Sequence, residues 1–276
     1  MKQSALLFGL NYGATPDSKL NGCVNDVQNV AEFLKKKGFQ DVQVYTDETT
    51  PKETTLEGLT RNLYNTAMRT WSEKVDVLWI HYSGHGSYMI DNSTDEADGK
   101  DECLVPSDYQ TAGLLTDDTI SKLLSQINPK TNVILFMDCC HSGTIADLKY
   151  CWTSRLNKTI ENANASHKGR ILMISGCRDD QTSADAFNID GSYKYAGAMT
   201  SCLLKSFETN PKSIDDVFTL LQDLRYWLNL GHFQQVPQLC SSTNISQKCY
   251  LIPKSRDIID TTDIALEESK CSCGCF

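Results

Sequence analysis

A histidine and a cysteine lie in short turns directly after two apolar runs of the sequence. Residues 75–82 lead into Gly84-His85-Gly86, and residues 133–137 lead into Asp138-Cys139-Cys140-His141-Ser142-Gly143. A thiolate is the nucleophilic form of cysteine, and a nearby imidazolium lowers the thiol pKa and can protonate a leaving amine. His85 and Cys140 are therefore candidates for the acid/base and the nucleophile of covalent catalysis. The main-chain N–H groups of Gly86 and Cys140 are candidates for an oxyanion hole.

Short strands that alternate with helices must position these residues. The apolar runs at 5–10, 75–82, 133–137 and 171–174 are unbroken and too short for typical helices, which favours strands buried on both faces. A weaker strand is expected at 42–45. Apolar residues at helical spacing in 27–34, 56–67 and 217–224 predict helices. This alternation predicts an α/β sandwich with a mostly parallel central sheet, whose catalytic groups gather beyond the carboxyl ends of the strands.

Local signals place helix starts and a loop. Thr50-Pro51-Lys52-Glu53 and Ser213-Ile214-Asp215-Asp216 resemble capping boxes at helix N-termini. The polar segment 147–169 predicts a long loop. We expect one domain at 1–255, followed by an acidic, mobile tail at 256–276.

Composition and charge exclude some classes of function. The chain has 276 residues and a formal net charge of −9, which opposes binding to nucleic acid and suits a basic substrate. The sequence shows no signal peptide and no long apolar run, so we expect a cytoplasmic monomer whose 12 cysteines are mostly reduced and buried.

The histidine and cysteine motifs together resemble those of metacaspases, relatives of the caspases. Either residue alone would be explained as a structural histidine or a small buried hydrophobe. His85 precedes Cys140 by 55 residues, however, and caspase-like proteases have a similar separation of about 50 residues. The resemblance covers about residues 5–240 and implies a caspase-hemoglobinase-like three-layer sandwich. It implies that His85, not His81, is the catalytic histidine, and that Cys140, not Cys139, is the nucleophile.

The resemblance also implies which substrate is cleaved. A pocket for the Arg or Lys before the cleaved bond, the P1 residue, needs carboxylates, because a buried cation must be paired. Asp138 precedes the nucleophile by two residues, and 21–27 resembles the family segment that contributes a cysteine and an aspartate. The implied pocket consists of Cys23, Asp26, Ser83 and Asp138. Taken alone, Asp26 would be explained as a solvated first-turn residue that favours the helix dipole.

Acidic residues crowd the segment after His85 and suggest a calcium site. Like charges at this density repel one another unless solvent or a cation screens them, and calcium prefers oxygen ligands. By the resemblance, the ligands are Asp101, Asp117, Asp118 and Asp147. The alternative is a solvated acidic loop with carboxylates at a helix N-terminus.

Other predictions concern processing, the tail and rival functions. The chain resembles type I metacaspases without a prodomain, and its basic residues between Lys149 and Arg170 are candidates for self-cleavage. Cys273-Gly-Cys-Phe276 fits a prenylation pattern, which would give weak membrane association through a lipidated cysteine. One rival is a catalytically silent caspase-like scaffold that binds partners. Another is a cysteine hydrolase acting on small amides, which would not need the acidic pocket.

Overall fold

The computed structural model describes residues 1–90, 100–140, 142–165, 167–176, 185–187, 195–210, 215–245 and 249–253. An eight-stranded sheet of order β2-β1-β3-β7-β10-β13-β8-β9 forms the middle layer. Its strands are β1 (Gln3–Gly9), β2 (Asp41–Thr46), β3 (Val77–Ser83), β7 (Asn132–Asp138), β8 (Tyr150–Ser154), β9 (Asn157–Ile160), β10 (Ile171–Ser175) and β13 (Gln238–Ser241). The five strands β2, β1, β3, β7 and β10 are parallel to one another, and β13, β8 and β9 extend the sheet by antiparallel pairing from β10. The predicted mostly parallel sheet is confirmed.

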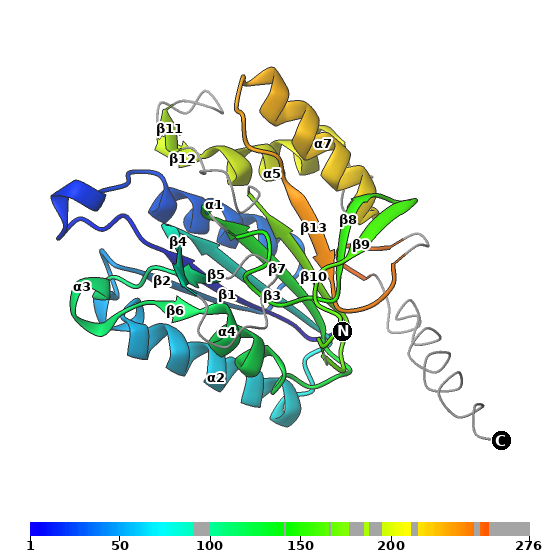
Figure 1. Cartoon of the computed structure of the whole chain (residues 1–276), viewed down its shortest axis with the longest axis horizontal. Coiled ribbons are helices and arrows are strands. Elements are labelled where there is room, and N and C mark those ends of the chain that lie inside the picture. The colour runs from blue at the N-terminus through cyan, green and yellow to red at the C-terminus, as the bar shows by residue number, and fades with distance from the viewer. Residues whose placement is uncertain are drawn as a thin grey trace.

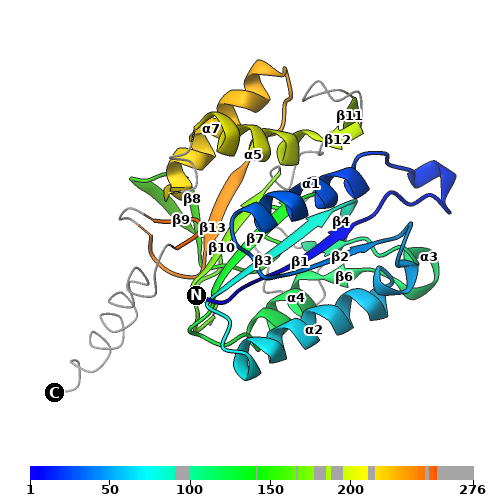
Figure 2. The same cartoon turned by 180° about the vertical axis from the view of Figure 1, so that it is seen from behind.

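Helices cover both faces of this sheet and complete three layers. Helices α1 (Cys23–Lys36), α5 (Ala198–Thr209) and α7 (Val217–Leu230) pack on one face (Figure 1), and α2 (Leu56–Ser72) and α4 (Asp117–Leu124) on the other. Figure 2 shows the same two layers from behind. The apolar residues divide accordingly into two cores, because alternate residues of each strand point to opposite faces.

Smaller elements gather near the carboxyl ends of the parallel strands. A three-stranded sheet contains β4 (Gly86–Ile90), β5 (Lys100–Leu104) and β6 (Leu115–Thr116), with the short helix α3 (Tyr109–Ala112) beside it. Short pieces complete the described chain: the 3₁₀ helices η1 (Pro16–Ser18) and η2 (Pro51–Glu53), and the hairpin of β11 (Asp185–Phe187) and β12 (Tyr195–Gly197).

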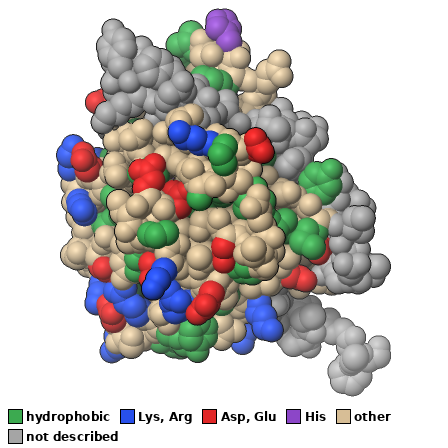
Figure 3. Space-filling view, turned by 90° about the vertical axis from the view of Figure 1, so that its left-hand side faces the viewer, with side chains coloured by type: hydrophobic (Ala, Val, Ile, Leu, Met, Phe, Trp, Pro, Cys, Tyr) green, Lys and Arg blue, Asp and Glu red, His purple; other side chains and the backbone are tan. Residues whose placement is uncertain are grey.

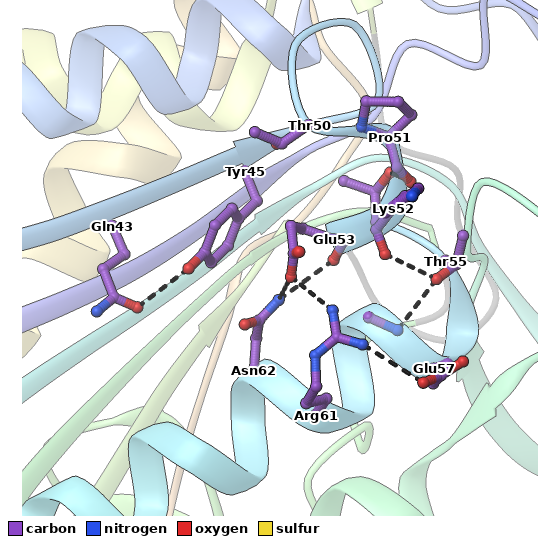
Figure 4. A network of polar contacts seen from close by, with 12 residues as sticks. Gln43, Tyr45, Thr50, Pro51, Lys52, Glu53, Thr55, Glu57, Arg61 and Asn62 are labelled. Carbon is purple, nitrogen blue, oxygen red and sulfur yellow. Dashed lines mark hydrogen bonds and ion pairs between the residues drawn. The ribbon is translucent and has the colours of Figure 1, made fainter.

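The predicted helix start at Thr50 is wrong. Pro51 opens only the 3₁₀ turn η2, and α2 begins later, with Thr55 as its N-cap residue. The Thr55 side chain accepts a hydrogen bond from the Gly58 N–H at 3.0 Å, whereas Glu53 is bound by Arg61 and Asn62 (Figure 4). The box therefore fails because its glutamate bonds forward to the helix surface instead of back to the Thr50 N–H. The second box includes Ser213 and Ile214, which lie outside the described residues; the helix expected there is α7.

The predicted long loop at 147–169 is also wrong in part, because it contains the hairpin of β8 and β9. Tyr150 and Trp152 point inward, and Trp152 is only 2% exposed. Their alternation with Cys151 and Thr153 is the period of a half-buried strand, which the surrounding basic residues obscured. Pairing with β13 extends the central sheet by two strands.

Two further observations concern the whole described chain. None of its described helices combines the length and the apolar character needed to cross a membrane. The eight cysteines in the described ranges are free thiols, and six of them are buried.

Candidate active site

The two motifs lie side by side because β3 and β7 are adjacent parallel strands. Ser83 at the end of β3 pairs with Asp138 at the end of β7, and the Gly84 N–H donates to the Asp138 carbonyl at 3.4 Å. The chain reaches His85 and Cys140 two residues beyond these positions. Cys139 is fully buried and Cys140 only half-buried, so of the two thiols Cys140 is the more accessible.

The backbone of Gly86 packs directly against that of Cys140. A Cβ atom at Gly86 would lie 1.8 Å from the Cys140 carbonyl oxygen and 2.9 Å from its carbonyl carbon. Only glycine permits this approach, because a methyl group would overlap the neighbouring peptide. The histidine turn and the cysteine turn therefore touch through their main chains, which places the two residues whose N–H groups are predicted to bind an oxyanion next to each other.

The His85 ring is oriented by a main-chain carbonyl from the 3₁₀ helix η1, which follows β1 in the chain. Its Nε2 lies 2.7 Å from the Ser18 carbonyl oxygen. Because a carbonyl can only accept a hydrogen bond, Nε2 must carry the proton, and in the neutral ring Nδ1 is then the basic nitrogen. This contact fixes the ring orientation and selects the tautomer.

Two buried tyrosines fix the backbone of the histidine turn. The Tyr12 hydroxyl accepts from the His85 N–H at 3.0 Å and donates to the Val105 carbonyl at 2.7 Å. The Tyr82 hydroxyl donates to the His85 carbonyl at 2.9 Å. Burial raises the pKa of both tyrosines well above the ordinary value, so both hydroxyls stay protonated. The Tyr12 ring also lies 4.8 Å from the His85 ring.

The four predicted pocket residues are all buried beside the two motifs. Asp26 and Ser83 are 1% exposed, Asp138 is 4% exposed and Cys23 is 6% exposed. The Ser83 hydroxyl donates to the Asp26 carboxylate at 2.6 Å. The structure thus brings α1, β3 and β7 together as the sequence analysis expected.

Both pocket carboxylates meet the N-terminus of α5. The Gly197 N–H donates to Asp26 at 2.9 Å, and the Thr200 N–H donates to Asp138 at 2.9 Å. A Cβ atom at Gly197 would lie 2.3 Å from the Asp138 Oδ2 and 2.8 Å from the Asp26 Oδ2, so the two carboxylates flank this glycine. Unpaired N–H groups and the helix dipole stabilise negative charge at this end of a helix.

The predicted calcium ligands are only partly brought together. Asp117, 2% exposed, accepts from the Glu102 N–H and the Asp118 N–H, each at 2.7 Å. The pKa of Asp117 is raised to about 8, mainly by burial. The negative charges of Asp147 and Glu102 also raise this pKa, and the hydrogen bonds from the two N–H groups lower it. Asp118 is exposed on α4, while Asp101 and Asp147 are half-buried.

The oxygen ligands of this cluster fit a hard cation such as calcium. Buried carboxylates lie near one another here, and each raises the free-energy cost of ionising its neighbours. In the ranges that the structure describes, however, no three His, Cys, Asp or Glu side chains are grouped as a metal site. Asp118 lies one residue after Asp117 on α4, so the two side chains leave the helix in different directions. Glu102, which sequence analysis did not include, belongs to this cluster and accepts from the Thr144 hydroxyl.

Several contributors to the site were not identified from the sequence: Tyr12, Ser18, Gly197 and Thr200. Tyr12 had a usable signal, because it lies three residues beyond a buried strand at the carboxyl edge of the sheet. Ser18 acts through its carbonyl oxygen, which every residue has. Thr200 contacts Asp138 across 62 residues, and no local pattern reports such a contact.

Comparison with known proteins gives one consistent family. A family model described as metacaspase, peptidase C14 domain, matches residues 3–149. Metacaspase-3 of Trypanosoma brucei brucei is 35% identical over 263 residues, covering 87% of this chain and 71% of the relative. Metacaspase-3 of Trypanosoma cruzi is 33% identical, covering 90% of this chain and 74% of the relative. The solved structure of caspase-1 from Spodoptera frugiperda has a TM-score of 0.60 at 14% identity, covers 92% of this chain and 91% of its own, and shows the shared fold.

Proposed function

The chain belongs to the metacaspase family and is a cysteine endopeptidase with a caspase fold, and from this premise we propose that it cleaves peptide bonds after Arg or Lys. Its substrates are proteins or peptides. The observation that carries the specificity is the pair of buried carboxylates, Asp26 and Asp138, at the edge of the sheet that carries Cys140.

The proposed chemistry uses His85 and Cys140. Since Nε2 of His85 is bound to the Ser18 carbonyl, Nδ1 is the nitrogen that takes the Cys140 thiol proton. The thiolate attacks the scissile carbonyl, and the main-chain N–H groups of Gly86 and Cys140 stabilise the oxyanion. The protonated histidine then gives its proton to the leaving amine, and water hydrolyses the acyl-enzyme.

The proposed specificity comes from electrostatics. A guanidinium or ammonium entering beside Asp26 and Asp138 gains charge-assisted hydrogen bonds. A P1 aspartate would meet two carboxylates of like charge and be rejected. Acidic side chains are visible near the middle of the molecular face in Figure 3, with Lys and Arg side chains among them. The formal net charge of −9 supports attraction of a basic substrate.

Calcium is the proposed activator, held by Asp101, Asp117, Asp118 and Asp147. Its charge would offset the repulsion that raises the Asp117 pKa. Bringing these carboxylates onto one ion requires a local rearrangement, since they are not gathered in the described structure. We propose that this rearrangement orders the segments beside the pocket.

Self-cleavage between residues 149 and 170 is a further part of the proposal, and the structure favours Lys168 as the site. Lys168 is exposed and lies outside the strands and helices. Arg155 instead forms an ion pair with Asp216, and Arg170 donates to the Tyr250 carbonyl at 2.7 Å. Sequencing the fragments that appear after calcium is added tests this site, with K168A as the altered chain.

A cytoplasmic monomer remains the proposed state of the enzyme. The cysteine-rich C-terminal segment proposed for lipid attachment lies outside the described residues, and mass spectrometry of the native C-terminus tests it. Catalytically silent scaffolds usually lose the nucleophile or the histidine, and the chain keeps both. Peptide hydrolysis by the wild type and by Cys140→Ala separates the enzyme from the scaffold.

A further inference from the structure

Thr200 contacts the pocket carboxylate through two donors at once. Its main-chain N–H and its hydroxyl both donate to the Asp138 Oδ2, at 2.9 and 2.7 Å. Thr200 is 1% exposed and is the third residue of α5, whose N-cap residue Gly197 has no side chain to cap the helix. Asp138 therefore supplies from β7 the cap that α5 lacks.

A buried histidine stands behind this hydroxyl. The Nε2 of His81 lies 3.5 Å from the Thr200 Oγ1. Because the hydroxyl proton is directed to Asp138, the hydroxyl oxygen can only accept from His81, which places the histidine proton on Nε2. His81 is fully buried and stacks on Phe136 at 5.2 Å, and its Nδ1 has no hydrogen-bond partner within the described chain. The order of donation is His81 to Thr200 to Asp138.

We infer that Thr200 is a positioning residue for P1 specificity, and that His81 orients its hydroxyl. This inference rests on the proposed cleavage after Arg or Lys. Two donors on one oxygen hold the carboxylate in one orientation before the substrate arrives, so less ordering is needed when a cation binds. The effect of the hydroxyl can be measured apart from the capping of α5. The Thr200 N–H, which provides the capping hydrogen bond to Asp138, remains in every substitution at this position except proline.

The experiment compares kcat/KM for two fluorogenic peptides that differ only at P1, one ending in Arg and the other in citrulline, its uncharged isostere. The Arg-to-citrulline ratio reports recognition of the charge and does not change when a variant is merely less stable or less abundant. The variants are T200A, T200V and T200S. The matched control is T209V on the same helix, where the Thr209 hydroxyl donates only to its own helix, to the Lys205 carbonyl at 2.7 Å.

Removal of the hydroxyl in T200A or T200V is expected to lower the ratio about tenfold, the usual scale for a hydrogen bond to a charged group. We expect T200S to keep the wild-type ratio, because serine retains the donor, and T209V to keep it as well. The H81F variant preserves the stacking and loses the donor; since its contact is longer, we expect a two- to threefold fall, roughly.

Equal ratios in T200A, T200V, T209V and the wild type would overturn the inference, and the threonine would then serve only the packing of α5. An unchanged ratio in H81F would overturn the role of the histidine alone. A wild-type enzyme that does not prefer Arg to citrulline would instead refute the proposed specificity itself. A variant that fails to fold, detected by its thermal unfolding curve, leaves the other hydroxyl-free variant to decide.

Discussion

Substitution of Gly86 by alanine should separate the two catalytic turns. The added Cβ would lie 1.8 Å from the Cys140 carbonyl oxygen, a separation that must grow by more than about 1 Å to relieve the overlap. The main chain fixes the position of the Cβ atom, and its partner is a main-chain oxygen, so no side-chain rotation can relieve the overlap. A misplacement of about 1 Å can cost roughly 10²-fold in rate. We therefore expect kcat to fall about a hundredfold in G86A.

The assay is hydrolysis of a fluorogenic peptide ending in Arg, followed under saturating and limiting substrate, with the melting temperature measured in parallel. The matched control is Gly13→Ala, since a Cβ atom there has nothing within 4 Å. G13A should keep wild-type activity. If G86A kept kcat within about threefold of the wild type, the contact between the turns would not determine catalysis and our account of the site would be refuted.

Two further predictions concern buried charge. Burial lowers the pKa of His81 to about 3 from the ordinary value of 6.5, so between these pH values the unfolded chain binds the proton and the folded chain does not. His81 therefore makes stability fall as pH drops below 6.5, by about 2.5 kcal/mol between pH 7 and 4.5. Because the raised pKa of Asp117 acts in the opposite direction over this range, the test is the difference between two urea-unfolding series. The wild type should lose about 2.5 kcal/mol more than H81F over this pH range, and equal pH dependence in the two proteins would contradict it. Calcium should raise the melting temperature of the wild type but not of Asp117→Asn, and magnesium should have little effect on either; an equal calcium shift in D117N would exclude Asp117 as a ligand.

The sequence was sufficient to predict the parallel part of the central sheet because most of its strands are unbroken apolar runs. The run before Ser83 and the run before Asp138 became adjacent parallel strands, and this adjacency brings His85 and Cys140 together. The hairpin of β8 and β9 was missed because only two residues, Tyr150 and Trp152, mark its inward face. A short edge hairpin needs little apolar sequence, so its period is easily obscured.

The residues that support the site could not be predicted for a different reason. The Ser18 contact uses a carbonyl, and the Thr200 contact joins segments far apart in the chain, so neither depends on a recognisable local pattern. The misplaced start of α2 shows the same limit at short range. Glu53 satisfied the pattern of a capping box, yet Arg61 and Asn62 bind it in the folded chain.

The central claim is that Cys140 attacks peptides whose P1 residue is basic. The most direct test is hydrolysis of matched fluorogenic peptides ending in Arg, Lys or Asp, with and without calcium, by the wild type and by Cys140→Ala. The account predicts calcium-dependent cleavage after Arg and Lys that vanishes in C140A. Cleavage after Asp, or activity that survives in C140A, would contradict it.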